Sequence, residues 1–187
     1  SEVHVAINPV DSNNIIVSTM RNAPDNLTAP LSFPTFYTKD FGATWQQSDF
    51  NGVSQGQAIL GGGDPIIVFD TNGKAYLSWL TVSFNLLQFE FKMSLRVAES
   101  EDGGATWTEL DAPIDEGDLL DALAGDFGKL VDKEWLAVDR SETSPYLNTV
   151  YASYLTLVSD SSTVNYNITL RKKTPDMTRC TEVSVPV

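Results

Sequence analysis

The chain has 187 residues, 42% of them hydrophobic, and a formal net charge of −13. This composition predicts a folded domain with an apolar core, and the acidic surface argues against nucleic acid as a partner because phosphate backbones would be repelled. Cys180 is the single cysteine, so no intrachain disulfide is expected. No apolar run reaches the roughly 18 residues that span a bilayer, so membrane insertion is not expected either.

Strand-like units recur three times along the chain. Each unit has an apolar strand, a turn rich in Asn, Asp, Gly or Pro, and then a strand of alternating β-branched and aromatic residues. Two further strands follow each pair. The predicted strands are 3–8, 14–20, 32–38 and 44–49; 65–69, 74–82, 90–99 and 106–110; and 134–138, 149–156, 165–172 and 181–185. Only residues 118–124 carry a pattern that could form a short helix.

A hairpin motif, Ser/Thr-x-Asp-x-Gly-x-Thr-Trp, joins the third and fourth strands of the first two units. The hydroxyl and the Asp can hydrogen-bond within the turn, the Gly allows a positive φ, and the Trp begins the next strand with a large apolar surface to bury. A degenerate copy lies at 174–178. We interpret the motif as a folding device rather than a metal or catalytic site. Its residues are Thr38, Asp40, Gly42 and Trp45, and Ser100, Asp102, Gly104 and Trp107.

These two hairpins, together with the strand pairs, resemble the sialidase-like Asp-box (BNR-repeat) β-propeller superfamily. The segments 8–15 and 132–139 are similar to secreted bacterial members. The resemblance implies an all-β propeller of three four-stranded blades, half of a six-bladed ring. Blade one is 1–55, blade two 56–115 and blade three 127–187, with an acidic connection at 111–126. Three blades leave two open apolar faces, so we expect a second half-propeller, either a missing part of the same chain or another copy.

In this superfamily the Asp boxes lie opposite the active-site face. Its sialidases hold a substrate carboxylate with three arginines, and the first stands in an Arg-Ile-Pro motif where this chain has Glu2-Val3-His4. Arg21 and Asp25 match the position of a later arginine and of the acid/base Asp, which makes Asp25 a candidate catalytic acid and Arg21 a candidate ligand-binding residue. The alternative is that both are solvated loop residues.

Three charged residues precede the first strands of the second and third blades, where they would point toward the mouth of the central pore. Asp64, Asp132 and Lys133 are therefore candidate ligand-binding residues. The acidic connection, residues 109–126, could bind Ca²⁺ through its oxygens, although its spacing does not match an EF-hand and solvated charge is the alternative. His4 has no second His or Cys nearby, so no zinc site is expected, and we interpret it as a partly buried structural residue.

These observations lead to three hypotheses of function. The first is extracellular glycan recognition without a complete catalytic site, because the resemblance places the nucleophilic Tyr, its Glu partner and two arginines in later blades. The alternatives are an exo-sialidase or other glycoside hydrolase completed by blades outside this chain, and a structural or adhesive surface propeller. The chain opens on a strand, as expected for the processed form of a secreted or cell-surface protein. Two sequons, at Asn26 and Asn167, leave glycosylation open.

Overall fold

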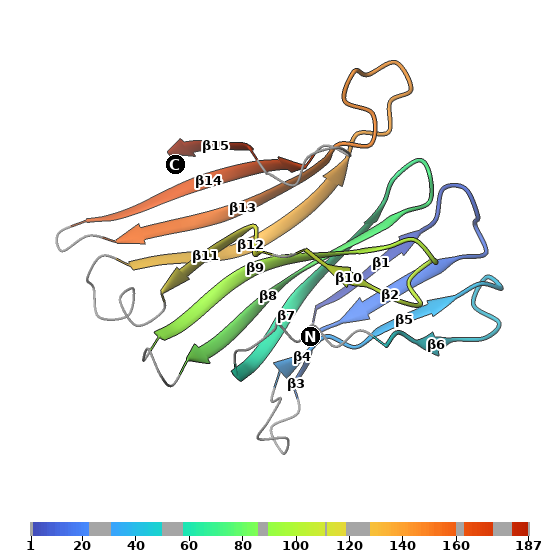
Figure 1. Ribbon diagram of the computed structural model, residues 1–187, viewed down its shortest axis with the longest axis horizontal. Coiled ribbons are helices and arrows are strands. Elements are labelled where there is room, and N and C mark those ends of the chain that lie inside the picture. The colour runs from blue at the N-terminus through green and yellow to red at the C-terminus, as the bar shows by residue number, and fades with distance from the viewer. Residues whose placement is uncertain are drawn as a thin grey trace.

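The computed structural model describes residues 2–22, 31–49, 58–85, 90–110, 112–118, 128–159, 163–173 and 181–186. Within these ranges every regular element is a β-strand, and all pairing is antiparallel. The strands form three sheets that stand side by side (Figure 1). The all-β prediction is confirmed. No helix among the described residues is long and apolar enough to cross a membrane.

Each sheet follows chain order from its first strand outward. The first sheet has the order β1-β2-β5-β6, the second β7-β8-β9-β10 with β11 also paired to β9, and the third β12-β13-β14-β15. β3 and β4 form a separate hairpin. The bounds are β1 Val3–Ile7, β2 Ile15–Thr19, β3 Arg21–Asn22, β4 Leu31–Ser32, β5 Thr35–Thr38, β6 Gln46–Gln47, β7 Ala58–Phe69, β8 Ala75–Asn85, β9 Glu90–Ser100, β10 Thr108–Glu109, β11 Asp115–Asp118, β12 Gly128–Val138, β13 Val150–Ser159, β14 Val164–Lys173 and β15 Thr181–Pro186.

Two strands begin earlier than predicted. β7 starts at Ala58 rather than at residue 65, and β12 at Gly128 rather than at residue 134. In both, the ladder continues past a break in register, between Gly63 and Ile66 in β7 and between Asp132 and Trp135 in β12. A β-bulge of this kind breaks the alternation of side chains along the strand. The alternation visible in the sequence therefore begins only after the bulge, and the strand start predicted from it is too late.

The acidic connection contains a strand that the sequence did not predict. β11 pairs with β9 beyond the short β10, and its Asp115 and Gly117 are buried. Gly117 permits close packing against β12, because a Cβ there would lie 1.8 Å from the Lys129 carbonyl oxygen. The interpretation of this segment as solvated charge is therefore wrong for Asp115. The proposed helix at 118–124 falls largely outside the described residues, and Asp118 ends β11.

The central sheet is covered on both faces. Along β7, Ile67 and Phe69 face the first sheet, whereas Ile66 faces the third. The core between the first and second sheets contains Ile16, Phe33, Ile67, Phe69, Ala75, Leu77, Trp79 and Ala98. The core between the second and third contains Ile66, Tyr76, Leu80, Leu95, Val97, Ile114, Val131, Leu136, Val150, Ala152 and Tyr154.

The outer faces of the first and third sheets expose apolar side chains. On β1, Val3, Val5 and Ile7 are 65%, 57% and 54% exposed. Val5 and Ile7 occupy the strand positions at which β7 buries Ile67 and Phe69. The third sheet exposes Trp135, Tyr166, Ile168 and Leu170. Positions that are buried in the central sheet are thus largely open at the two ends of the row, where the Trp135 ring meets only the edge of His4 from the described sheets.

The two predicted hairpins carry closely matching hydrogen bonds. In the first, the Thr38 hydroxyl donates to Asp40 at 2.6 Å, and the Thr44 backbone NH donates to Asp40 at 2.8 Å. In the second, Ser100 donates to Asp102 at 2.9 Å, and the Thr106 NH donates to the same carboxylate at 2.9 Å. Gly42 and Gly104 have φ of +90° and +94°, as the turn requires.

The two hairpin tryptophans differ in burial. Trp107 packs against the core between the first and second sheets, and its indole NH donates to the Gly104 carbonyl at 3.2 Å. Trp45 is 45% exposed, so the expectation that it would be buried is wrong. Trp107 packs on the preceding sheet, and no described sheet precedes Trp45.

Candidate functional site

The first strands of the three sheets bring charged residues together at one end. β1 and β12 both lie against β7. Three charged residues occupy equivalent positions, each five residues before the end of a first strand. They are Glu2, just before β1, Asp64 in β7 and Lys133 in β12. In β7 and β12 this position opens the bulge, where Asp64 and Lys133 have φ of 53° and 55°. With Asp132 and Glu134 they form what we call the central cluster.

The charges of the central cluster act on one another across the sheets. The Lys133 Nζ lies 3.6 Å from a Glu2 carboxylate oxygen. The pKa of Asp64 is raised by burial and then by the charge of Glu2 and a side-chain hydrogen bond with it. The pKa of Lys133 is raised by the carboxylates of Glu2, Asp132 and Asp64. Residues from three sheets therefore behave as one electrostatic unit.

Glu134 is the buried member of the central cluster. It is 4% exposed, and neither of its carboxylate oxygens has a hydrogen-bond partner among the described residues. Burial raises its pKa to about 8; the residue's own backbone NH acts in the opposite direction, and the charges of Asp64, Asp132 and Glu2 add to the increase. The equivalent positions hold Pro65 in β7 and Val3 in β1, so strand packing alone does not require an ionisable residue here.

His4 links the three sheets next to this cluster. Its Nδ1 accepts a hydrogen bond from the Ile67 backbone NH at 3.1 Å, and its ring meets Trp135 edge-on at 5.5 Å. Burial lowers its pKa, which favours the neutral ring that this bond needs. These contacts fit the predicted structural role, since the nitrogen that could act as a base is already occupied.

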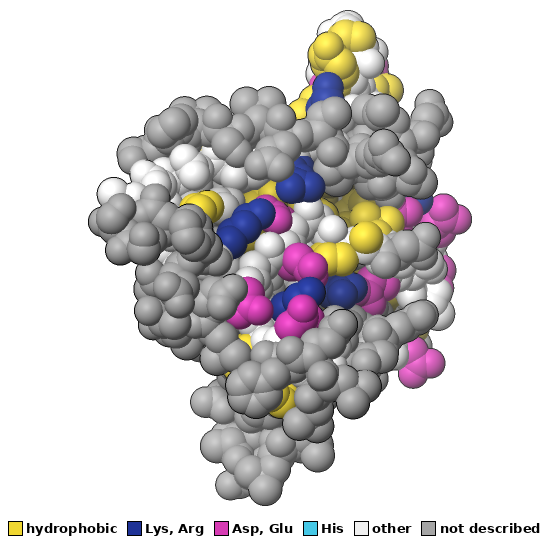
Figure 2. Space-filling view, turned by 60° about the vertical axis from the view of Figure 1, so that its left-hand side comes forward, with side chains coloured by type: hydrophobic (Ala, Val, Ile, Leu, Met, Phe, Trp, Pro, Cys, Tyr) yellow, Lys and Arg dark blue, Asp and Glu magenta, His cyan; other side chains and the backbone are white. Residues whose placement is uncertain are grey.

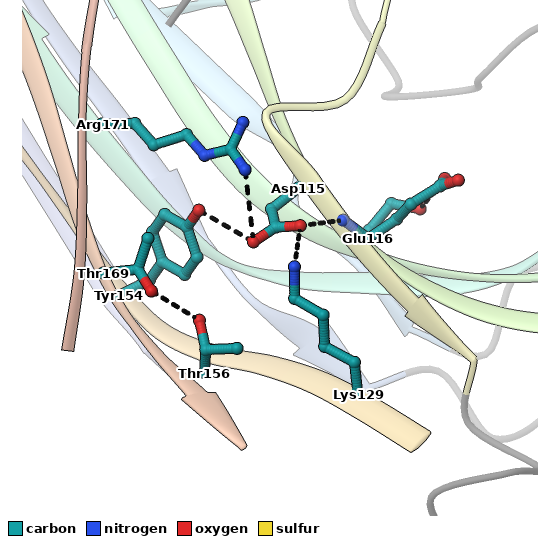
Figure 3. A network of polar contacts seen from close by, with 8 residues as sticks. Asp115, Glu116, Lys129, Tyr154, Thr156, Thr169 and Arg171 are labelled. Atoms are coloured by element: carbon teal, nitrogen blue, oxygen red, sulfur yellow. Dashed lines mark hydrogen bonds and ion pairs between the residues drawn. The ribbon is translucent and has the colours of Figure 1, made fainter. Parts of the chain in front are cut away.

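A second polar network lies between β11 and the third sheet (Figure 3). Asp115 is 8% exposed and accepts a hydrogen bond from the Tyr154 hydroxyl at 2.9 Å. Lys129 pairs with the same carboxylate, and Arg171 lies 3.8 Å from it. Because cations already surround Asp115, this network does not resemble a calcium site. In the described ranges no group of three or more His, Cys, Asp or Glu residues could hold a metal ion.

The structure places the predicted site residues as follows. Asp64, Asp132 and Lys133 come together in the central cluster. Arg21 is exposed on β3, one residue after Met20, whose backbone NH donates to the Glu2 carbonyl at 2.8 Å, so it lies at the same end of the sheets. Asp25 lies outside the described residues, as does Asn26. The other sequon residue, Asn167, lies within β14.

Sequence reasoning missed Glu134. The sequence carried no local signal for its burial, because the β-bulge at Lys133 breaks the alternation of buried and exposed residues just before it. Figure 2 shows acidic and basic side chains gathered next to one another on one face of the molecule.

No protein-family model matches the chain, and no curated protein matches it by sequence. Solved structures do match in fold. A mutant of the α-L-arabinofuranosidase Arb93A from Fusarium graminearum, in complex with an iminosugar inhibitor, shares 13% identity at a TM-score of 0.54, over 98% of this chain and 65% of that one. The GH93 α-L-arabinofuranosidase of Fusarium graminearum with arabinobiose shares 14% identity at a TM-score of 0.53, over 97% of this chain and 60% of that one. The Penicillium chrysogenum α-L-arabinanase with arabinobiose shares 11% identity at a TM-score of 0.51, over 98% of this chain and 61% of that one.

These similarities concern the fold, and the chain spans less than two thirds of the length of each of these structures. The predicted propeller is confirmed in this coarser form. The matching structures are arabinan-related glycosidases rather than sialidases, so they do not support the sialidase-specific part of the resemblance. The three packed sheets described here therefore form part of a β-propeller with the architecture found in these glycosidases.

Proposed function

We propose that this chain is the ligand-carrying part of a propeller that binds a glycan over the central cluster and cleaves a glycosidic bond there. The observation that carries the proposal is Glu134, a buried carboxyl group whose oxygens have no hydrogen-bond partner among the described residues and which feels the charges of Asp64 and Glu2. Its pKa of about 8 keeps it mostly protonated at neutral pH. A protonated carboxylic acid beside other carboxyl groups is the arrangement on which acid-assisted glycoside cleavage depends.

The chemistry divides between two carboxyl groups. Glu134 would donate its proton to the glycosidic oxygen as the bond between that oxygen and the anomeric carbon breaks. A water molecule would attack the anomeric carbon and lose a proton to an ionised carboxylate of the cluster, with Asp64 and Glu2 as the candidates. Protons and electron pairs then balance, with no cofactor required.

Two further observations support a glycan ligand and a larger ring. Two of the matching structures contain arabinobiose, and one contains an iminosugar inhibitor. The open apolar faces at Val3, Val5 and Ile7 and at Trp135 support additional blades that complete the ring, whether from the same chain or from another copy. A six-bladed ring and an exported or cell-surface location stay predictions.

Glycan recognition without cleavage is the second candidate. It is favoured by the interaction with Glu2 that raises the pKa of Asp64 and by the Glu2–Lys133 ion pair, which already engage the groups that would serve as the base. In this case the central cluster would bind sugar hydroxyl groups only.

Hydrolysis assays separate the two candidates. The substrates are arabino-oligosaccharides and a panel of aryl glycosides that includes an aryl sialoside. We expect Glu134→Gln to lose about 10²- to 10⁴-fold in kcat, whereas Glu142→Gln, in an exposed turn, should keep the wild-type rate. Turnover should fall as the pH rises above 8. Wild-type binding without turnover would favour recognition alone, and turnover unaffected by Glu134→Gln would refute the assigned role.

A further inference from the structure

The balance of charge in the central cluster bears on which sugars it accepts. Among the described residues the cluster holds four carboxyl groups, those of Glu2, Asp64, Asp132 and Glu134, and one amine, that of Lys133. The amine is already committed, since it pairs with Glu2 at 3.6 Å and feels the charges of Asp132 and Asp64. An incoming carboxylate would therefore meet acidic groups with no unpaired amine of the cluster to offset them.

Three other cations have carboxylate partners, and Arg21 is the exception. Lys92 pairs with Glu90 and Glu116 at 3.3 and 3.4 Å. Lys129 and Arg171 surround the buried Asp115. Arg21 is exposed on β3 and forms no ion pair with another described side chain. A set of converging cations, which recognition of a carboxylate would need, is not present among the described residues.

The buried acid shows that the cluster is more than solvated surface charge. Both oxygens of Glu134 lack a hydrogen-bond partner in the described chain, although the residue is 4% exposed. Burying such a group without a partner costs free energy, and the equivalent Pro65 and Val3 show that the strand position tolerates apolar residues. A ligand whose hydroxyl or ring oxygen accepts the proton of this acid would satisfy it.

We propose that the central cluster selects neutral glycans and rejects sugars that carry a carboxylate, such as uronic and sialic acids. The inference rests on the proposed glycan function and names the substrate class of the same site. Hydroxyl groups can donate to the ionised carboxylates and accept from Glu134 and Lys133, so a neutral sugar satisfies both kinds of group. A sugar carboxylate can only accept, and it would be repelled by the carboxylates of Glu2 and Asp132.

A glycan array printed in pairs tests this inference. Each neutral oligosaccharide stands beside a counterpart that differs by one uronic or sialic acid residue. We expect the wild-type protein to bind the neutral member about tenfold or more tightly than the acidic one, the size of one like-charge contact at intermediate dielectric. The double variant Glu2→Gln/Asp132→Asn should reduce this preference by about tenfold.

The matched control removes the same number of charges elsewhere. Glu101→Gln/Glu142→Gln changes exposed residues in a third-to-fourth-strand hairpin and a first-to-second-strand turn, and the preference should stay at its wild-type value. Equal or tighter binding of the acidic members by the wild-type protein would overturn the inference while leaving the glycan function intact. Binding of neither class, together with no hydrolysis, would overturn the proposed function and this inference with it.

Discussion

Glu134→Gln should change how stability depends on pH. Burial raises the pKa of Glu134 to about 8 from an ordinary value of 4.5. Between these values the unfolded chain releases the proton while the folded chain keeps it. The unfolded state is therefore favoured as the pH rises, and the stability of the wild-type protein falls from about pH 4.5 to about pH 8.

The size of this change in stability follows from the titration of one proton, that of Glu134. Each pH unit in this window is worth about 1.4 kcal/mol, so Glu134 alone should lower the free energy of unfolding by about 2–3 kcal/mol between pH 5 and pH 7. Glutamine has nearly the same shape and does not titrate. The free energy of unfolding of Glu134→Gln relative to the wild-type protein should therefore rise by about 2–3 kcal/mol over the same interval.

Urea denaturation of both proteins at pH 5, 6 and 7 measures this difference. A constant cost of burying the amide shifts all three values equally, so the slope with pH is the informative quantity. Glu142→Gln, at an exposed turn, serves as the control and should follow the wild-type slope. Parallel curves for the wild-type protein and Glu134→Gln would refute the assignment of a buried, protonated acid.

Three other substitutions test the architecture. Ser100→Ala removes the buried hydroxyl that donates to Asp102 at 2.9 Å and should cost about 1–2 kcal/mol in urea denaturation; an unchanged midpoint would contradict a structural role for the hairpin. Gly117→Ala places a Cβ against the Lys129 carbonyl and should destabilise by about 3 kcal/mol or more; an unchanged Tm would contradict the packing of β11 on β12. Because burial lowers the pKa of His4 below 6.5, wild-type stability gains from this residue as the pH rises through its folded pKa toward 6.5; His4→Gln should lack this gain, and equal pH curves would refute it.

The two hairpins show what local sequence predicts well. Thr38 and Asp40, like Ser100 and Asp102, hydrogen-bond to residues within four positions of themselves, so residue types and spacing suffice to specify the turn. The strand pairs were predictable for the same reason, since alternation and turn residues act over short distances. The burial of the hairpin tryptophans was not, because Trp107 has a preceding sheet to pack on and Trp45 has none among the described residues.

The central cluster shows where sequence reasoning stops. Asp64, Asp132 and Lys133 could be named as ligand-binding candidates from their positions before strands, and the structure brings them together with Glu2. Glu134 could not be identified, because a bulge at Lys133 shifts the register, and its burial depends on packing against another sheet. β11 was missed for a related reason. It consists of three acidic residues and a glycine, which do not have a strand-like pattern, and it pairs with β9 only because β9 extends beyond β10.

By itself the sequence determined the all-β class, the three repeating units and the turn chemistry of the hairpins, since these depend on side-chain type and on contacts within a few residues. The tertiary structure decided which charged residues meet, which acid is buried and which apolar faces stay open. Those properties depend on contacts between sheets that are some sixty residues apart in the chain, as Glu2, Asp64 and Lys133 are. The pKa of Glu134 in particular arises from desolvation and from neighbours on other sheets, and no local pattern encodes either.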